Sequence, residues 1–187
     1  MNDSVRALRN DESPGHQSLV RFLSEDHARL DELFRRAVDR EGPIDQTAYD
    51  GFRAGLLRHI GMEEKILLPA AQRCGGKPLP IAQALRLDHG ALACLLMPTP
   101  TPAIITAIRA ILTRHNQLEE GPDGLYARCE RLAGPEAGAL LERLMAAPEL
   151  HVMPHSDSPH VLETVRRVVA RAGYALPEDP AGTEPDG

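Results

Sequence analysis

Residues 58–64 read RHIGMEE and residues 114–120 read RHNQLEE. A second motif, DHxxL, also occurs twice, as DHARL at 26–30 and as DHGAL at 88–92. The order along the chain is DHxxL, RHxxxEE, DHxxL, RHxxxEE, which is an internal twofold repeat. The repeat contains six side chains that could bind a metal: His27, His59, Glu63, His89, His115 and Glu119.

Apolar residues recur three and four positions apart around each motif, and this spacing predicts helices. We expect long helices at about 16–40, 46–74, 80–97 and 102–132, the last broken or kinked at GPDG (121–124). Further helices are expected at about 135–147 and 159–172. Because the connections are short, consecutive helices should be antiparallel. The sequence therefore predicts an all-α, up-down-up-down four-helix bundle with a C-terminal helical extension.

The 187 residues divide into four parts on this interpretation. These are a flexible N-terminal arm (1–14), the four-helix bundle (15–150), a loop and helix packing on the bundle (151–175) and a disordered tail (176–187). The net charge of -6 and the lack of a basic stripe argue against a nucleic-acid partner. No apolar run is long enough to cross a membrane. The polar N-terminus is unlike a signal peptide, and three scattered cysteines do not form a disulfide framework, so we expect a cytoplasmic location.

All six candidate ligands lie within the apolar stripe of their helix, so they should face the core. Burying such groups without partners costs several kcal/mol each, which bound metal would offset. A His and a Glu four residues apart share one helix face and can serve the same cluster. Four His and two Glu exceed one tetrahedral zinc and suit two ions, with two His each, both carboxylates bridging and an oxygen bridge. Imidazole plus carboxylate indicates iron, with manganese as the alternative.

Other polar residues near the motifs are interpreted more simply. Four acidic side chains flank the candidate ligands: Asp26, Glu64, Asp88 and Glu120. The two Glu are expected to be solvated or to support a ligand, and the two Asp to be solvated or paired with arginine rather than to orient a histidine. A Pro-rich loop carries three more histidines: His151, His155 and His160. We expect these on the surface, or in a lid over the bundle end. Tyr49 and Tyr126 are expected in the core or at its rim rather than as metal ligands.

The order H…HxxxE…H…HxxxE in a four-helix bundle resembles the hemerythrin-like family, the HHE cation-binding domains. The resemblance spans about 16–133, through SEDHARLDELF (24–34), LRHIGMEEKILLPA (57–70), LDHGALACLL (87–96) and RHNQLEEGPDGLYARC (114–129). It implies two non-haem iron ions, oxo- or hydroxo-bridged, bound by the six candidate ligands. It also implies binding or sensing of O2 or another small diatomic ligand, or of redox state or iron.

Two features depart from the oxygen carriers of that family. Ala93 stands where a further histidine is expected one turn after His89, and Gly121-Pro122 directly follow the last motif. We therefore expect Glu119 to be more mobile than Glu63, which should lie in regular helix, and to gate ligand access. The sequence leaves two alternatives open: a di-iron enzyme acting on peroxide, nitric oxide or O2, and a metal-stabilised regulatory module. It identifies no protein partner.

Overall fold

The computed structural model describes residues 18–39 and 43–179, and these contain helices and no strand. The predicted N-terminal arm (1–14) and the end of the predicted tail (180–187) lie outside the described residues. The α-helices are α1 (Leu19–Val38), α2 (Gln46–Met62), α3 (Leu68–Gly75), α4 (Ala82–Leu95), α5 (Pro102–Glu120), α6 (Leu125–Ala133), α7 (Ala137–Met145) and α8 (Pro159–Arg171). Each predicted helix is present, within a few residues of its expected bounds.

Four of the eight α-helices described begin at residues whose side chains cap the helix start. Ser18, Asp45, Thr101 and Ser158 each accept a hydrogen bond from a backbone N–H three residues later. Such caps satisfy donors that have no partner within the helix. Pro102 follows its cap directly, where a missing N–H costs nothing.

A short π-helix, η1 (Glu63–Leu67), separates α2 from α3. Pro69 has no N–H and cannot bond to the carbonyl of Lys65, and the wider turn, in which the Leu68 N–H bonds to the Glu63 carbonyl, accommodates it. The expectation that Glu63 lies in regular helix is therefore wrong. Single π turns are frequent at functional sites, and this one begins at a candidate ligand.

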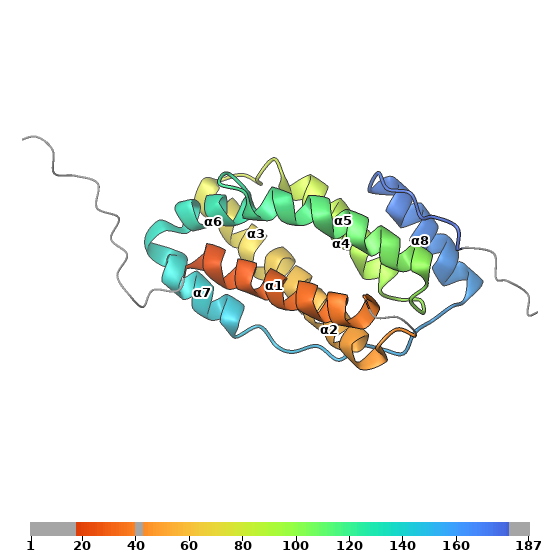
Figure 1. Cartoon of the computed structure of the whole chain (residues 1–187). Coiled ribbons are helices and arrows are strands. Elements are labelled where there is room, and N and C mark those ends of the chain that lie inside the picture. The colour runs from red at the N-terminus through yellow and green to blue at the C-terminus, as the bar shows by residue number, and fades with distance from the viewer. Residues whose placement is uncertain (1–17, 40–42, 180–187) are drawn as a thin grey trace, which may run out of the picture.

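The long helices lie side by side, with α1 against α2 and α5, and α4 against α5 (Figure 1). Two buried apolar clusters fill the interior between them. One joins the C-terminal part of α1 and the N-terminal part of α2 to α4, α5 and α8, and contains Phe34, Phe52 and Ile108. The other joins the start of α1 to α3, α6 and α7, and contains Leu23 and Tyr126. The candidate ligands lie between these two clusters, so the apolar core surrounds a polar layer.

The C-terminal segment covers one side of the helices. α8 packs on α4 and buries Val165 and Val169 (Figure 1). The segment between α7 and α8 contacts α2, because Arg53 donates a hydrogen bond to the Met153 carbonyl at 3.1 Å. Residues 176–179, expected within a disordered tail, lie against α5, where Asp179 accepts a hydrogen bond from the Ala103 N–H.

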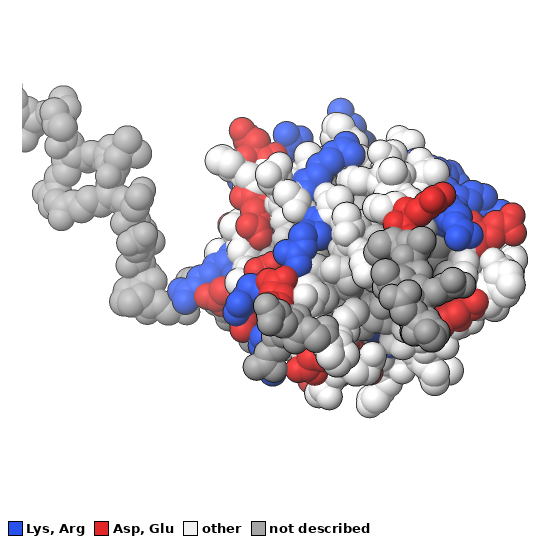
Figure 2. Space-filling view, turned by 45° about the vertical axis from the view of Figure 1, so that its right-hand side comes forward, with Lys and Arg blue, Asp and Glu red and all other residues white. Residues whose placement is uncertain are grey.

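The surface of the described part carries mixed charge. Acidic and basic side chains are interspersed among uncharged ones on the face drawn in Figure 2. None of the helices described is both long and apolar enough to cross a membrane.

Candidate metal centre

The six predicted ligands meet in the polar layer of the core. They come from α1, α2, η1, α4 and α5, and each is at most 7% exposed: His27, His59, Glu63, His89, His115 and Glu119. They form two overlapping groups whose ligand atoms all lie within 4.8 Å of one another. One group contains the histidines of α1 and α2, the other contains those of α4 and α5, and the two glutamates belong to both. Either group could hold a metal ion.

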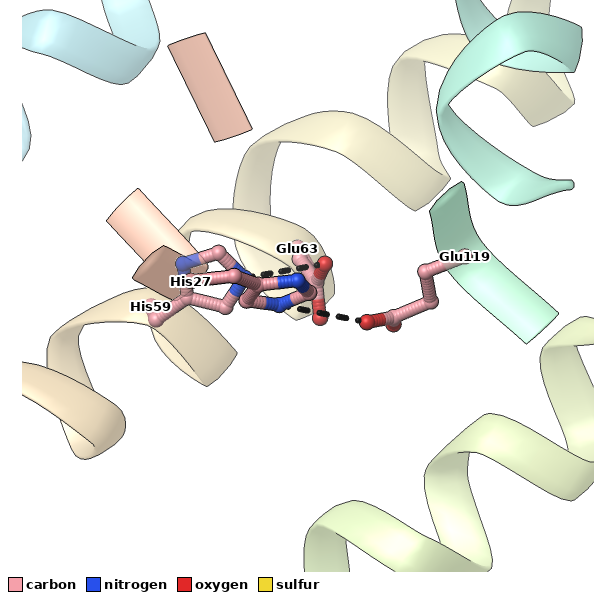
Figure 3. Close-up of side chains that lie close together, drawn as sticks. All are labelled: His27, His59, Glu63 and Glu119. Atoms are coloured by element: carbon pink, nitrogen blue, oxygen red, sulfur yellow. Dashed lines mark ion pairs between the residues drawn. The ribbon is translucent and has the colours of Figure 1, made fainter. Parts of the chain in front are cut away.

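The two shared carboxylates each span both histidine pairs. Glu63 places Oε1 3.3 Å from His59 Nε2 and Oε2 3.0 Å from His89 Nε2. Glu119 places Oε2 3.5 Å from His27 Nε2 and Oε1 3.1 Å from His115 Nε2. Figure 3 shows the first histidine pair with both glutamates. Each carboxylate therefore offers one oxygen to each side, as a bridge between two ions requires.

Several of these atoms are close together without being hydrogen-bonded. Glu63 Oε2, His89 Nε2 and Glu119 Oε1 are buried and have no hydrogen-bond partner among the described residues. His89 Nε2 nevertheless lies 3.0 Å from Glu63 Oε2 and 3.8 Å from Glu119 Oε1. These atoms are therefore close together but are not oriented for a hydrogen bond. A buried polar atom left without a partner costs about 1–3 kcal/mol. A cation among the three atoms would satisfy all of them, so the residues present fit a bound metal.

The outer nitrogens of the histidines face a ring of carboxylates. The Nδ1 pairs are His59 with Asp26 at 2.8 Å, His89 with Glu64 at 2.7 Å, His115 with Asp88 at 3.4 Å and His27 with Glu120 at 2.6 Å. The acidic residue of each motif thus faces the histidine of the next motif along the chain, and the acidic residue of the last motif faces the histidine of the first. The pair at 3.4 Å lacks hydrogen-bond geometry. An Nδ1–H held by a carboxylate directs the Nε2 lone pair inward, as metal-binding histidines require.

This ring corrects the interpretation of the two aspartates. Asp26 does pair with an arginine, Arg29, but it also hydrogen-bonds to His59, and Asp88 is 2% exposed beside His115. Solvent is therefore not their main environment. The sequence signal for this ring is the repetition of the dipeptides DH and EE. In each dipeptide one residue is a candidate ligand, and its acidic neighbour faces a histidine on another helix.

The electrostatics of the site couple metal binding to proton release. Burial lowers the pKa of each histidine, but facing carboxylates outweigh it and raise the pKa of His59 to about 10, of His89 to about 11 and of His115 to about 9. At His27 the effect of burial, together with the charge of His59, is larger than that of the facing carboxylates, so the pKa of His27 is lowered. Without a metal the centre therefore holds imidazolium–carboxylate pairs. A metal ion must displace these protons, so its affinity rises with pH.

Tyr126 of α6 also belongs to this site, although the sequence favours a place in the core or at its rim over a role as a metal ligand. Its fully buried hydroxyl lies within 3.2 Å of ligand atoms on four side chains: His27, His59, Glu63 and Glu119. The GPDG turn brings α6 back onto the site. A Cβ at Gly124 would lie 2.4 Å from the Glu119 carbonyl oxygen, so this close reversal needs glycine.

A small pocket of about 110 Å³ adjoins His27. Half of its lining residues are polar or charged, among them Asp31, Arg109 and Thr113, and the other half are apolar: Leu30, Phe34, Phe52, Leu56 and Leu112. The pocket also includes Asn116, whose buried side-chain oxygen has no hydrogen-bond partner among the described residues. It offers space for a small molecule beside the centre.

The three histidines predicted in a Pro-rich loop do not join this centre, and His160 lies in α8 rather than in the loop. His155 stacks on Tyr49 and hydrogen-bonds to Gln46 at the start of α2, while His151 and His160 are exposed. Both groups of described residues that could hold a metal belong to the buried centre. No protein-family model, curated protein or solved structure matches the chain.

Proposed function

We propose that this chain is a hemerythrin-like, non-haem di-iron protein that binds or senses O2 or another small diatomic ligand. In this proposal α1, the α2–α3 segment, α4 and α5 are the four helices of an up-down-up-down bundle. Its four histidines and two glutamates are the iron ligands. The observation that carries the proposal is that both carboxylates offer one oxygen to each histidine pair.

The donor set supports two ions rather than one. Each side of the centre has two imidazole nitrogens and one oxygen from each glutamate, which gives four protein donors per ion. Nitrogen and oxygen donors in this proportion suit iron. The four motifs, in the order that resembles the hemerythrin-like family, favour iron over manganese.

The chain's own residues prepare the site for a small ligand. The carboxylate ring holds the imidazoles of His27, His59 and His89 with Nε2 inward, and the two apolar clusters keep bulk water from the centre. The adjoining pocket of about 110 Å³ is much smaller than the roughly 300–1,000 Å³ of drug-sized ligand sites. Reduced iron would supply the electrons and the open coordination position for O2. The small size of the pocket favours a diatomic molecule over a larger substrate.

Stopped-flow mixing of the iron-loaded, reduced protein with O2 tests this function. We expect a long-lived oxygenated spectrum that reverses when O2 is removed. Zinc-loaded protein is the control, because zinc can fill the same ligands but does not undergo redox chemistry. Failure to bind iron, or continuous consumption of O2 with no lasting complex, would contradict the proposal.

A further inference from the structure

We propose that the Tyr126 oxygen is a fifth protein ligand to the ion held by His27 and His59. This inference rests on the proposed function, because it assigns a further ligand to the same centre. It concerns a residue outside both His/Glu groups that could hold a metal. Tyrosine oxygen is an established iron ligand in proteins, as in catalase haem.

The distances around the hydroxyl match the edges of an octahedron. Tyr126 Oη lies 3.0 Å from His27 Nε2 and from His59 Nε2, 2.8 Å from Glu63 Oε1 and 3.2 Å from Glu119 Oε2. At metal–ligand distances of about 2.1 Å, adjacent octahedral ligands are about 3.0 Å apart. One vertex of an octahedron has four such neighbours, and Tyr126 has four.

Ordinary core packing does not explain this arrangement. Tyr49 shows what a merely packed tyrosine looks like in the same protein. It is also 0% exposed, yet its hydroxyl has no hydrogen-bond partner among the described residues. The Tyr126 hydroxyl instead lies where nitrogen and oxygen donors from three other segments of the chain converge.

The backbone before Tyr126 is shaped to deliver it to the centre. α5 ends at Glu120, and Gly124 allows the chain to pass so close to the Glu119 carbonyl that any side chain would collide. α6 then starts at Leu125 and points Tyr126 back at the carboxylate that precedes the turn. The two ends of the GPDG turn thus place Glu119 of α5 and Tyr126 of α6 at the same centre.

The two ions would consequently have unequal surroundings. The ion at His27 and His59 gains a fifth protein donor, with the phenol proton released to solvent as its oxygen binds the cation. The His89 and His115 side has no such contact from Tyr126. Ala93, one turn after His89, offers no donor there either. The second ion therefore keeps more coordination positions for an external ligand.

Optical and resonance Raman spectroscopy of the ferric protein test the ligand. The chain has three tyrosines, so Tyr126→Phe removes the proposed ligand and the double variant Tyr49→Phe/Tyr174→Phe leaves Tyr126 as the sole tyrosine. Each protein is loaded with Fe(II) without air, oxidised, and assayed for iron. We expect a visible phenolate-to-ferric absorption, with enhanced phenolate ring vibrations, in the wild type and the double variant. At least a tenfold loss of that absorption per iron is expected in Tyr126→Phe.

The outcomes separate this inference from the proposed function. Iron uptake by the wild type without phenolate absorption would overturn the tyrosine ligand and leave the di-iron proposal standing. Persistence of the absorption in Tyr126→Phe would also overturn it. If Tyr126→Phe does not fold, the double variant decides, because its ferric form must show the phenolate vibrations. A wild type that binds no iron would overturn both proposals.

Discussion

Replacing Asp26 with asparagine tests the carboxylate ring at one point. Asp26 Oδ2 lies 2.8 Å from His59 Nδ1, while Oδ1 is held by Arg29. The pair is charged, because burial raises the pKa of Asp26 but the hydrogen bonds and charges of His59 and Arg29 together outweigh that effect and lower the pKa to about 2. Asparagine keeps the volume and removes the charge. The loss of a carboxylate behind a metal-binding histidine weakens metal binding by about 10–100-fold, or about 1.4–2.7 kcal/mol.

The affinity can be measured with zinc and a competing chromophoric chelator, so that no redox step intervenes. Glu32→Gln is the control, because Glu32 is exposed on the same helix and does not line the pocket beside the centre. We expect the control to bind within about twofold of the wild type and Asp26→Asn to bind at least about tenfold more weakly. Circular dichroism verifies that both variants are helical. Equal zinc affinity in the two variants would refute the role of the ring in holding the ligands.

Three further predictions concern the ligands themselves. His115→Ala should lower the metal content, and in saturating metal it should lower the melting temperature by about 5–10 °C. This shift corresponds to the loss of about 2.7 kcal/mol of stabilisation by the bound metal. His151 is exposed, so His151→Ala should match the wild type in calorimetry and metal assay. In the metal-free protein, His59 has a folded pKa of about 10, against 6.5 unfolded. Its contribution to stability is complete below pH 6.5 and is lost as pH rises towards 10, so the melting temperature should fall over that range; a rise would contradict the pairing. Glu119→Ala should retain more iron than Glu63→Ala and change the rate of reaction with O2, because Glu119 lies at a helix end; equal iron loss would count against gating.

The helices and the inward direction of the ligands could be predicted because both depend on local periodicity. His27 lies between Leu23 and Leu30 on one face of α1, and all three are buried. A side chain's place on that face follows from 3.6 residues per turn and needs no knowledge of the neighbouring helix. The glycines and proline of GPDG (121–124) likewise predicted the break, and α5 ends at Glu120.

The ring and Tyr126 could not be predicted in this way because both depend on contacts between helices. Asp26 adjoins His27 in sequence and points about 100° away around the helix, so its partner depends on which helix lies there. That partner is His59, 33 residues later. Tyr126 reaches the centre only through the direction in which α6 leaves the GPDG turn. The π turn at Glu63 accommodates Pro69, six residues further on. This cause is local, but the regular spacing of apolar residues through the segment predicts an uninterrupted helix.

Metal analysis of the folded chain is the most direct test of whether the buried centre holds two ions. The protein is titrated with Fe(II) without air, separated from unbound metal, and assayed for iron and protein, beside His89→Ala as a variant lacking one donor of the second ion. We predict two iron ions per wild-type chain, and a clear loss of bound iron in His89→Ala. A wild type that holds one ion or none under saturating Fe(II), or two ions that His89→Ala retains at undiminished affinity, would contradict this prediction.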